Sequence, residues 1–135
     1  MNHPIFRSLD HLAILVPDTD EALKIWRDRV GLTVLYSEVV NQGAIRLTHL
    51  DLGNTHLQLV QPLTKDHPLQ SWLAKNGPGL HHLCFRVDDV GQAFVELPRQ
   101  GLTVAPATHQ GTQGKRALFL ASRATQGVQI EVTGK

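Results

Sequence analysis

The sequence predicts an α+β fold made of two copies of a βαβββ module. The first observation is a repeat: residues 9–16 resemble residues 80–87, and the tetrapeptide Gly-Leu-Thr-Val occurs at 31–34 and again at 101–104. A third match, between the last strand segments of the two halves, follows in the same order. The second observation is a helical pattern between the first two matches in each half. Ordered matches at nearly constant spacing indicate a duplicated module.

The first module is expected to contain a strand, a helix and three further strands. The opening strand covers about 9–16 and ends before Pro17, which cannot donate a ladder hydrogen bond. Asp18, with Glu21 three residues later, forms a capping box that starts the helix, and Gly31 ends it. The apolar stripe of this helix consists of Ala22, Ile25, Trp26 and Val30. Turn residues then separate three strands at about 33–40, 44–52 and 55–61.

The second module repeats this order after a linker at 62–78 that carries a short amphipathic helix. A strand near 80–87 precedes a helix that Asp89 caps and that ends near Pro98. The remaining strands are expected at about 103–107, 116–121 and 127–133.

The two modules are expected to form one domain over residues 1–135, with module one at about 7–61 and module two at about 79–133. Neither half alone has enough apolar surface for a stable core. The linker is therefore expected to pack against the modules rather than to separate two domains.

The composition excludes several functional classes. Of 135 residues, 41% are hydrophobic and 19% are charged, which is typical of a folded domain. The 13 basic and 12 acidic residues leave a net charge of +1 without a basic aromatic cluster, so no nucleic acid partner is expected. No apolar run approaches the roughly 18 residues of a membrane span and no signal peptide is recognisable, so a cytoplasmic protein without a membrane partner is expected. The single cysteine, Cys84, cannot form an internal disulfide.

Four polar residues occupy equivalent places in the two modules. His11 and His82 lie in the opening strands, and Gln58 and Glu131 lie in the last strands. If the modules pack with pseudo-twofold symmetry, the four side chains can converge on one centre and supply two imidazoles, an amide oxygen and a carboxylate to a divalent ion. Each residue alone is more often a hydrogen-bonded strand residue than a ligand. Four such side chains at equivalent positions of apolar strands favour one shared ion.

Over residues 9–133 the chain resembles the vicinal oxygen chelate superfamily, and within it the methylmalonyl-CoA epimerase family. The resemblance rests on Asp10-His11-Leu12, on Gly-Leu-His-His-Leu at 79–83 and on Gly-Val-Gln-Ile-Glu at 127–131. It implies that the paired modules form a cupped, incompletely closed mixed β-sheet, and that the protein is a homodimer. The ligands of a metal ion in the cup would be His11, Gln58, His82 and Glu131.

The resemblance also implies an isomerase that abstracts and returns the α-proton of an acyl-CoA thioester, with methylmalonyl-CoA as the expected substrate. A cobalt, manganese, nickel or zinc ion would stabilise the enolate as a Lewis acid. Glu131 is the expected first acid–base group as well as a ligand. Some epimerases carry a glutamate three residues after the glycine of the Gln-Gly turn. Arg46 stands at the matching position of this chain and cannot accept a proton at neutral pH.

Four further residues are assigned roles as hypotheses. His56, two residues before Gln58 and on the same strand face, is the candidate second acid–base group. Arg46 is expected on the cup face, where its guanidinium can bind the substrate carboxylate or a CoA phosphate. Lys115 and Arg116 follow a glycine-containing loop and are candidate contacts for the substrate's phosphates.

Three further histidines and the cysteine are weaker candidates for a part in the chemistry. His81 points to the opposite face from His82 and is expected to be structural. His67 and His109 lie in predicted loops and are expected to be solvated. Cys84 is expected to be a small core residue.

Two other functional classes remain open. One is another metal-dependent enzyme of the superfamily, either a glyoxalase-type lyase or an iron-dependent extradiol dioxygenase. A dioxygenase needs two histidines and one glutamate as iron ligands, and His11, His82 and Glu131 meet this requirement. Gln58 as a fourth ligand would leave less room for both oxygen and a bidentate substrate. The other class is a metal-free small-molecule binding protein, which generally lacks this ligand set. Bound metal and iron dependence distinguish these classes.

Overall fold

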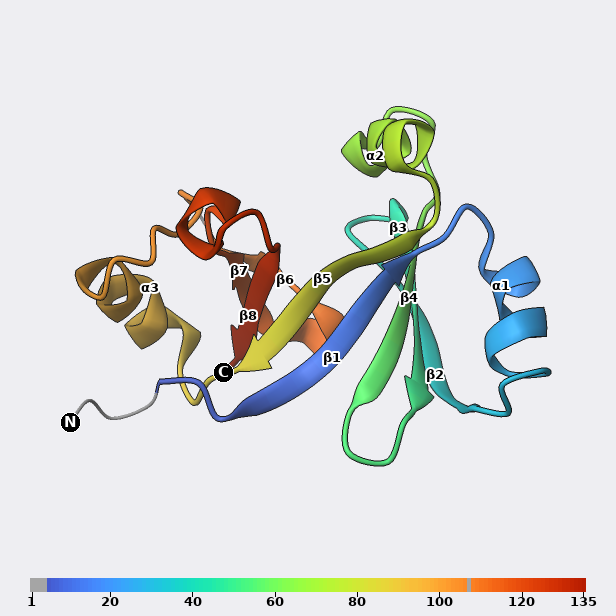
Figure 1. Cartoon of the computed structure of the whole chain (residues 1–135), viewed down its shortest axis with the longest axis horizontal. Coiled ribbons are helices and arrows are strands. Elements are labelled where there is room, and N and C mark those ends of the chain that lie inside the picture. Colours follow the sequence, from blue (N-terminus) through green and yellow to red (C-terminus); the bar gives the residue numbers. More distant parts are fainter. Residues whose placement is uncertain (1–4, 107) are drawn as a thin grey trace. The chain divides into compact units, whose positions relative to one another are not determined.

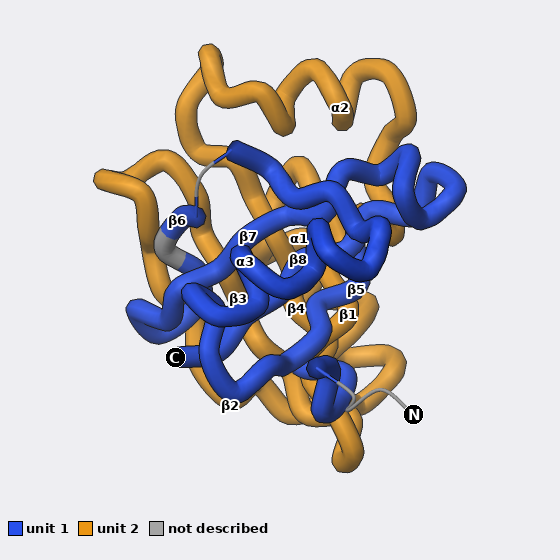
Figure 2. Tube along the Cα trace, turned by 90° about the vertical axis from the view of Figure 1, so that its left-hand side faces the viewer, with its two compact units in different colours: residues 1–10, 82–135 blue, residues 11–81 orange. Residues whose placement is uncertain are grey.

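The computed structural model describes residues 5–106 and 108–135 (Figure 1). The chain divides into two compact units, which Figure 2 shows in different colours. Unit 1 comprises residues 1–10 and 82–135, and unit 2 comprises residues 11–81. The predicted linker at 62–78 therefore belongs to unit 2, and the first ten residues group with the second module.

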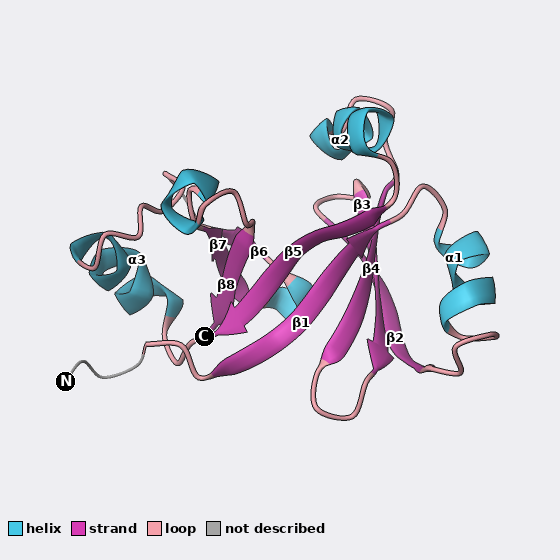
Figure 3. Ribbon diagram, viewed as in Figure 1, coloured by secondary structure: helices cyan, strands magenta, loops and turns pink. Residues whose placement is uncertain are grey.

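Unit 2 contains a four-stranded mixed sheet in the order β2-β3-β4-β1 (Figure 3). The parallel pair is β1–β4, and β3 is antiparallel to both of its neighbours. The elements are β1 (Ser8–Leu15, of which residues 11–15 belong to this unit), α1 (Thr19–Trp26), β2 (Thr33–Val40), β3 (Ile45–Asp51), β4 (His56–Pro62) and α2 (Pro68–Asn76).

The two helices of unit 2 pack on different groups of sheet residues. Helix α1 contributes Leu23 to a buried cluster with Leu50, Leu57 and Leu59. Strand residues alternate between faces, so the neighbours of these leucines point to the other side of the sheet. On that side Ala13, Leu15, Leu47 and Val60 form a second cluster, against which Leu69, Trp72 and Leu73 of α2 pack. Helix α1 thus covers one face, and α2 covers part of the other.

Unit 1 repeats the arrangement with strand order β5-β8-β7-β6. The parallel pair is β5–β8, and β7 is antiparallel to both β8 and β6. The elements are β5 (Gly79–Arg86, of which residues 82–86 belong to this unit), α3 (Val90–Arg99), β6 (His109–Gln110), a short 3-10 helix (Thr112–Gly114), β7 (Arg116–Phe119), a second 3-10 helix (Ser122–Thr125) and β8 (Ile130–Gly134).

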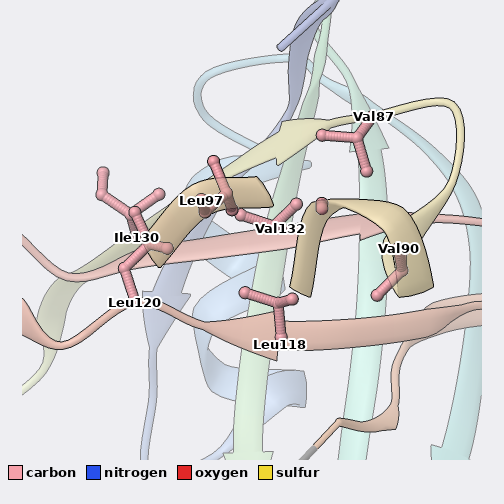
Figure 4. Packing of buried hydrophobic residues seen from close by; sticks show 8 residues of the cluster. Val87, Val90, Leu97, Leu118, Leu120, Ile130 and Val132 are labelled. Carbon is pink, nitrogen blue, oxygen red and sulfur yellow. The ribbon is translucent and has the colours of Figure 1, made fainter. Parts of the chain in front are cut away.

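Helix α3 covers one face of the unit 1 sheet. Its buried residues Val90, Ala93 and Leu97 pack against residues of β7, β8 and their flanks (Figure 4). The strand side of this cluster is formed by Val87, Leu118, Leu120, Ile130 and Val132. Each unit therefore has a helix-covered apolar face, and the predicted order of strand, helix and three strands is present in both.

Both predicted helix starts are confirmed. The side chain of Asp18 accepts a hydrogen bond from the backbone N–H of Glu21 at 3.0 Å, and that of Asp89 accepts one from Gln92 at 2.8 Å. These bonds satisfy backbone donors that have no partner within the helix.

The first helix is shorter than expected. It ends at Trp26, and the predicted stripe residues Ile25 and Val30 are 47% and 53% exposed. The chain leaves the helical path before Val30, so this residue is not held against the sheet, and the buried helix residues are Thr19 and Leu23 instead.

The predicted strand at 103–107 is wrong for its described part, residues 103–106. This segment contains only an isolated bridge between Val104 and Leu120, and Ala107 lies outside the described residues. Pro106 explains the interruption, because it has no N–H for the ladder. The short strand β6 follows at His109–Gln110 instead.

None of the helices in the described part of the chain is long and apolar enough to span a membrane.

Candidate functional site

The polar residues of unit 2 lie on the sheet face opposite α1. Parallel pairing of β1 with β4 places His11 beside His56 and Ala13 beside Gln58. Residues that pair across adjacent strands point to the same side of the sheet. His11 and Gln58 are almost fully buried, with 1% and 3% of their surface exposed. The two predicted ligands of this half of the chain therefore lie on neighbouring strands and share a face.

His49 completes a group of buried polar side chains on this face. Antiparallel pairing places it opposite Gln58, and only 1% of its surface is exposed. Its Nε2 lies 3.0 Å from Nε2 of Gln58, and its Nδ1 lies 3.0 Å from Nδ1 of His56. The ring stacks on Tyr36 with centroids 4.6 Å apart and meets the His11 ring edge to face at 5.4 Å.

His49 is a residue that the sequence analysis missed. It lies in a strand that mixes apolar and polar residues, and the repeat offers no counterpart in the second module that draws attention to it. A strict alternation count from Gln58 across the hairpin identifies it only when the pairing register is known.

Arg46 is not where the sequence analysis placed it. On β3 it pairs with Gln61, whose side-chain oxygen accepts a hydrogen bond from the Thr19 hydroxyl of α1. Its guanidinium lies 3.1 Å from Asp20 of α1 and donates to Ser37 at 3.1 Å. The expectation that Arg46 faces the same side as Gln58 is therefore wrong. The register pairs His49 with Gln58, so Arg46, three residues earlier, points to the α1 side.

Unit 1 carries the second predicted pair in an equivalent register. Parallel pairing places Cys84 beside Glu131, as Ala13 lies beside Gln58 in unit 2. His82, two residues before Cys84, shares their face. Its Nε2 lies 3.4 Å from Oε1 of Glu131, and the two residues are 7% and 8% exposed.

Glu131 has a second partner, His109. Nε2 of His109 lies 2.9 Å from Oε2 of Glu131, and the imidazole stacks on Phe119 with centroids 5.0 Å apart. The expectation of a solvated loop residue is therefore wrong for His109. Pairing of β6 with β7 holds this histidine opposite Ala117, on the face that also bears Glu131.

His67 also differs from expectation, because it caps α2. Its Nδ1 accepts a hydrogen bond from the backbone N–H of Leu69 at 3.1 Å. His81 contacts Trp72 of α2 edge to face at 4.8 Å, in keeping with the expected structural role.

Cys84 is fully buried in unit 1. Burial, together with the nearby carboxylates of Glu131 and Asp10, raises the pKa of the Cys84 thiol far above its ordinary value. The sulfur therefore stays protonated at neutral pH, as expected for a core residue rather than a nucleophile.

Lys115 and Arg116 line a surface hollow of unit 1 with a volume of about 610 Å³. The same hollow is also lined by Arg86, by Lys135 and by one aspartate, Asp88. Lys115 also lies 4.0 Å from Asp10. The side chain of Arg116 lies near Gly91 at the start of α3, so it points away from the face that bears Glu131. The hollow concentrates four cationic side chains.

Comparison with known proteins gives a consistent family. Residues 10–119 match the family model of the glyoxalase/bleomycin resistance protein/dioxygenase superfamily. Methylmalonyl-CoA epimerase of Mus musculus, a mitochondrial protein, is 34% identical over 128 residues, which cover 92% of this chain and 71% of the relative.

Two solved structures extend the likeness to the fold. The methylmalonyl-CoA epimerase from Mycobacterium tuberculosis has a TM-score of 0.89 at 28% identity, covering 99% of this chain and 91% of its own. A variant of the Streptomyces coelicolor methylmalonyl-CoA epimerase, in complex with 2-nitronate-propionyl-CoA, has a TM-score of 0.85 at 28% identity, covering 96% and 98%. The predicted fold class is confirmed by these matches.

Proposed function

The chain belongs to the glyoxalase/bleomycin resistance protein/dioxygenase superfamily, and within it we propose an epimerase that removes and returns the α-proton of methylmalonyl-CoA. The observation that carries the proposal is one buried pair in each unit, His11 with Gln58 and His82 with Glu131, in equivalent strand registers. The likeness to methylmalonyl-CoA epimerases over more than nine-tenths of the chain supports the reaction and the acyl-CoA substrate class.

We propose that these four residues bind one divalent metal ion. The chemistry of the donors fits: imidazole, amide oxygen and carboxylate are all ligands of cobalt, manganese, nickel and zinc. The 3.4 Å between His82 Nε2 and Glu131 Oε1 suits two atoms that bind a common ion. Such an ion supplies a positive charge that favours the negative charge developing on the thioester oxygen as the α-proton leaves.

The proposed acid–base groups are Glu131 and His56, one for each face of the α-carbon. Glu131 has two carboxylate oxygens, and His109 holds Oε2 at 2.9 Å, which orients the group. His56 is partly exposed, and its Nδ1 is engaged with His49, so its Nε2–H is the group that can return a proton to the α-carbon. Inversion requires that the proton leaves to one group and returns from the other.

Lys115 and Arg116 are proposed to bind phosphates of CoA. The cationic hollow that they line with Arg86 and Lys135 supports this role, because clustered lysine and arginine side chains recognise phosphate. Arg46 is left out of the substrate site, since its guanidinium pairs with Asp20 on the α1 side of the sheet.

The reaction is tested by incubating the cobalt-loaded protein with methylmalonyl-CoA in deuterated water and following the α-hydrogen by proton NMR. Loss of that signal well above the spontaneous rate, abolished by a chelator, is the expected result. A protein with measured metal content and no exchange would contradict the proposed substrate and favour another reaction of the superfamily. Cleavage of a catechol, the substrate type of an extradiol dioxygenase, only with ferrous iron and oxygen would indicate that class instead.

The phosphate contacts are tested with the double variant Lys115→Glu/Arg116→Glu. Two exposed charge contacts contribute at most about 1 kcal/mol each, so reversing both charges should raise KM for methylmalonyl-CoA about tenfold with little change in kcat. The KM for methylmalonyl-pantetheine, which lacks the phosphates, should not change. Arg99→Glu, at an exposed position of α3, is the matched control. An equal rise in KM for both substrates would contradict phosphate binding.

A homodimer is proposed on the resemblance alone, and sedimentation of the purified protein measures it directly.

A further inference from the structure

The hydrogen bonds of His49 determine how the Gln58 amide is turned. The amide nitrogen of Gln58 can only donate, so Nε2 of His49, at 3.0 Å, accepts this hydrogen bond. A neutral imidazole has one acceptor and one donor nitrogen. Nδ1 of His49 therefore carries the proton and donates to Nδ1 of His56, also at 3.0 Å. His56 then carries its proton on Nε2.

This chain of hydrogen bonds leaves the amide oxygen of Gln58 directed away from His49. Only that oxygen can bind a cation, because the amide nitrogen has no lone pair available for one. The terminal torsion of a glutamine is broad and roughly twofold, so a free amide readily exchanges the places of its oxygen and nitrogen. In the Nδ1–H tautomer, Nε2 of His49 can only accept, and this tautomer favours the amide orientation in which the oxygen of Gln58 points away.

The His49 ring is itself held firmly. It is buried, stacks on Tyr36 with an interplanar angle of 17°, and meets His11 edge to face. Pairing of β3 with β4 sets it directly opposite Gln58. Both partners of the hydrogen bond are therefore fixed by the sheet and by ring contacts.

We propose that His49 is a positioning residue that turns the oxygen of Gln58 toward the metal ion. The inference rests on the proposed function, because that function makes Gln58 a ligand. The repeat does not predict this role of His49, since it depends on the pairing of β3 with β4. Residues that orient a metal ligand typically change metal affinity about 10- to 100-fold when they are replaced.

Two substitutions of His49, by glutamine and by asparagine, separate its two hydrogen bonds. In His49→Gln the side-chain oxygen can take the place of Nε2 and accept from Gln58. In His49→Asn the amide reaches only the place of Nδ1, so the bond to His56 can form and the bond to Gln58 cannot. Cobalt affinity of the purified variants is measured by isothermal titration calorimetry, with the visible spectrum of bound cobalt as a second readout. Thermal unfolding of the metal-free variants shows whether each is folded.

We expect His49→Asn to bind cobalt about 10- to 100-fold more weakly and His49→Gln to remain within about threefold of the parent protein. Equal affinities for the two variants would overturn the positioning role. Gln58→Ala distinguishes the two levels of the proposal. Unchanged cobalt affinity of Gln58→Ala overturns both the ligand and the positioning residue, whereas a loss there with an unchanged His49→Asn overturns only the positioning residue.

The tautomers provide a test without metal. Long-range nitrogen–proton NMR correlations of the metal-free protein should show His49 with its proton on Nδ1 and His56 with its proton on Nε2. A proton on Nε2 of His49 would mean that the Gln58 amide is turned the other way. This result would overturn the inference whatever the variants show.

Discussion

Glu131→Gln should lower kcat for epimerisation of methylmalonyl-CoA by about 10²- to 10⁴-fold, the range that a positioned acid–base group contributes. Glutamine has nearly the same volume, and its amide oxygen can still accept from His109, which lies 2.9 Å from the carboxylate. The variant therefore loses the ability to exchange a proton while the packing around this 8% exposed side chain is preserved. Initial rates with matched cobalt content measure the effect.

The cobalt content separates loss of a base from loss of a ligand. A variant with full metal occupancy and unchanged kcat would remove Glu131 from the acid–base chemistry. His56→Ala provides the comparison. If the two residues serve opposite faces of the α-carbon, this variant should lose epimerisation yet retain solvent exchange of one stereoisomer, catalysed by Glu131. Retained epimerisation would exclude His56 as the second acid–base group.

Leu118→Ala should reduce the free energy of unfolding by about 2–5 kcal/mol, the range for a buried leucine truncated to alanine. Leu118 is fully buried on β7 and packs in the cluster under α3 that Figure 4 shows. Removal of three carbon atoms leaves a cavity between the helix and the sheet, and the closely packed side chains around it fill this cavity only in part. Urea unfolding monitored by circular dichroism measures the loss.

Val95→Ala is the matched control for this prediction. Val95 lies on α3, the helix that covers this cluster, but is 53% exposed, so its truncation should change stability by no more than about 0.5 kcal/mol. A similar loss in both variants would show that the burial of Leu118 does not account for the effect.

The fold was readable from the sequence because its signals are local. Both helix starts depend on an aspartate whose side chain reaches a backbone N–H three residues later. The strands follow from short β-prone runs separated by turns, and the repeat of these signals identifies the two modules. The segment at 103–106 was misread because β-propensity there competes with Pro106, and pairing with a partner strand decided the outcome.

The faces of the strands were less readable. Alternation predicts correctly that His82 shares a face with Cys84, because both belong to one strand. It does not relate one strand to the next, since a shift of one residue in the register moves a side chain to the other face. Arg46 was assigned to the wrong face for this reason.

The sequence by itself determined the duplicated α+β architecture, the helix starts and the equivalent positions of His11, Gln58, His82 and Glu131. These features are encoded over a few residues or by the repeat. Only the tertiary structure decided that His49 contacts Gln58, that His109 contacts Glu131 and that Arg46 pairs with Asp20. Each of these contacts joins residues of different elements. Strand register and burial select such partners, and no local pattern of side chains records them.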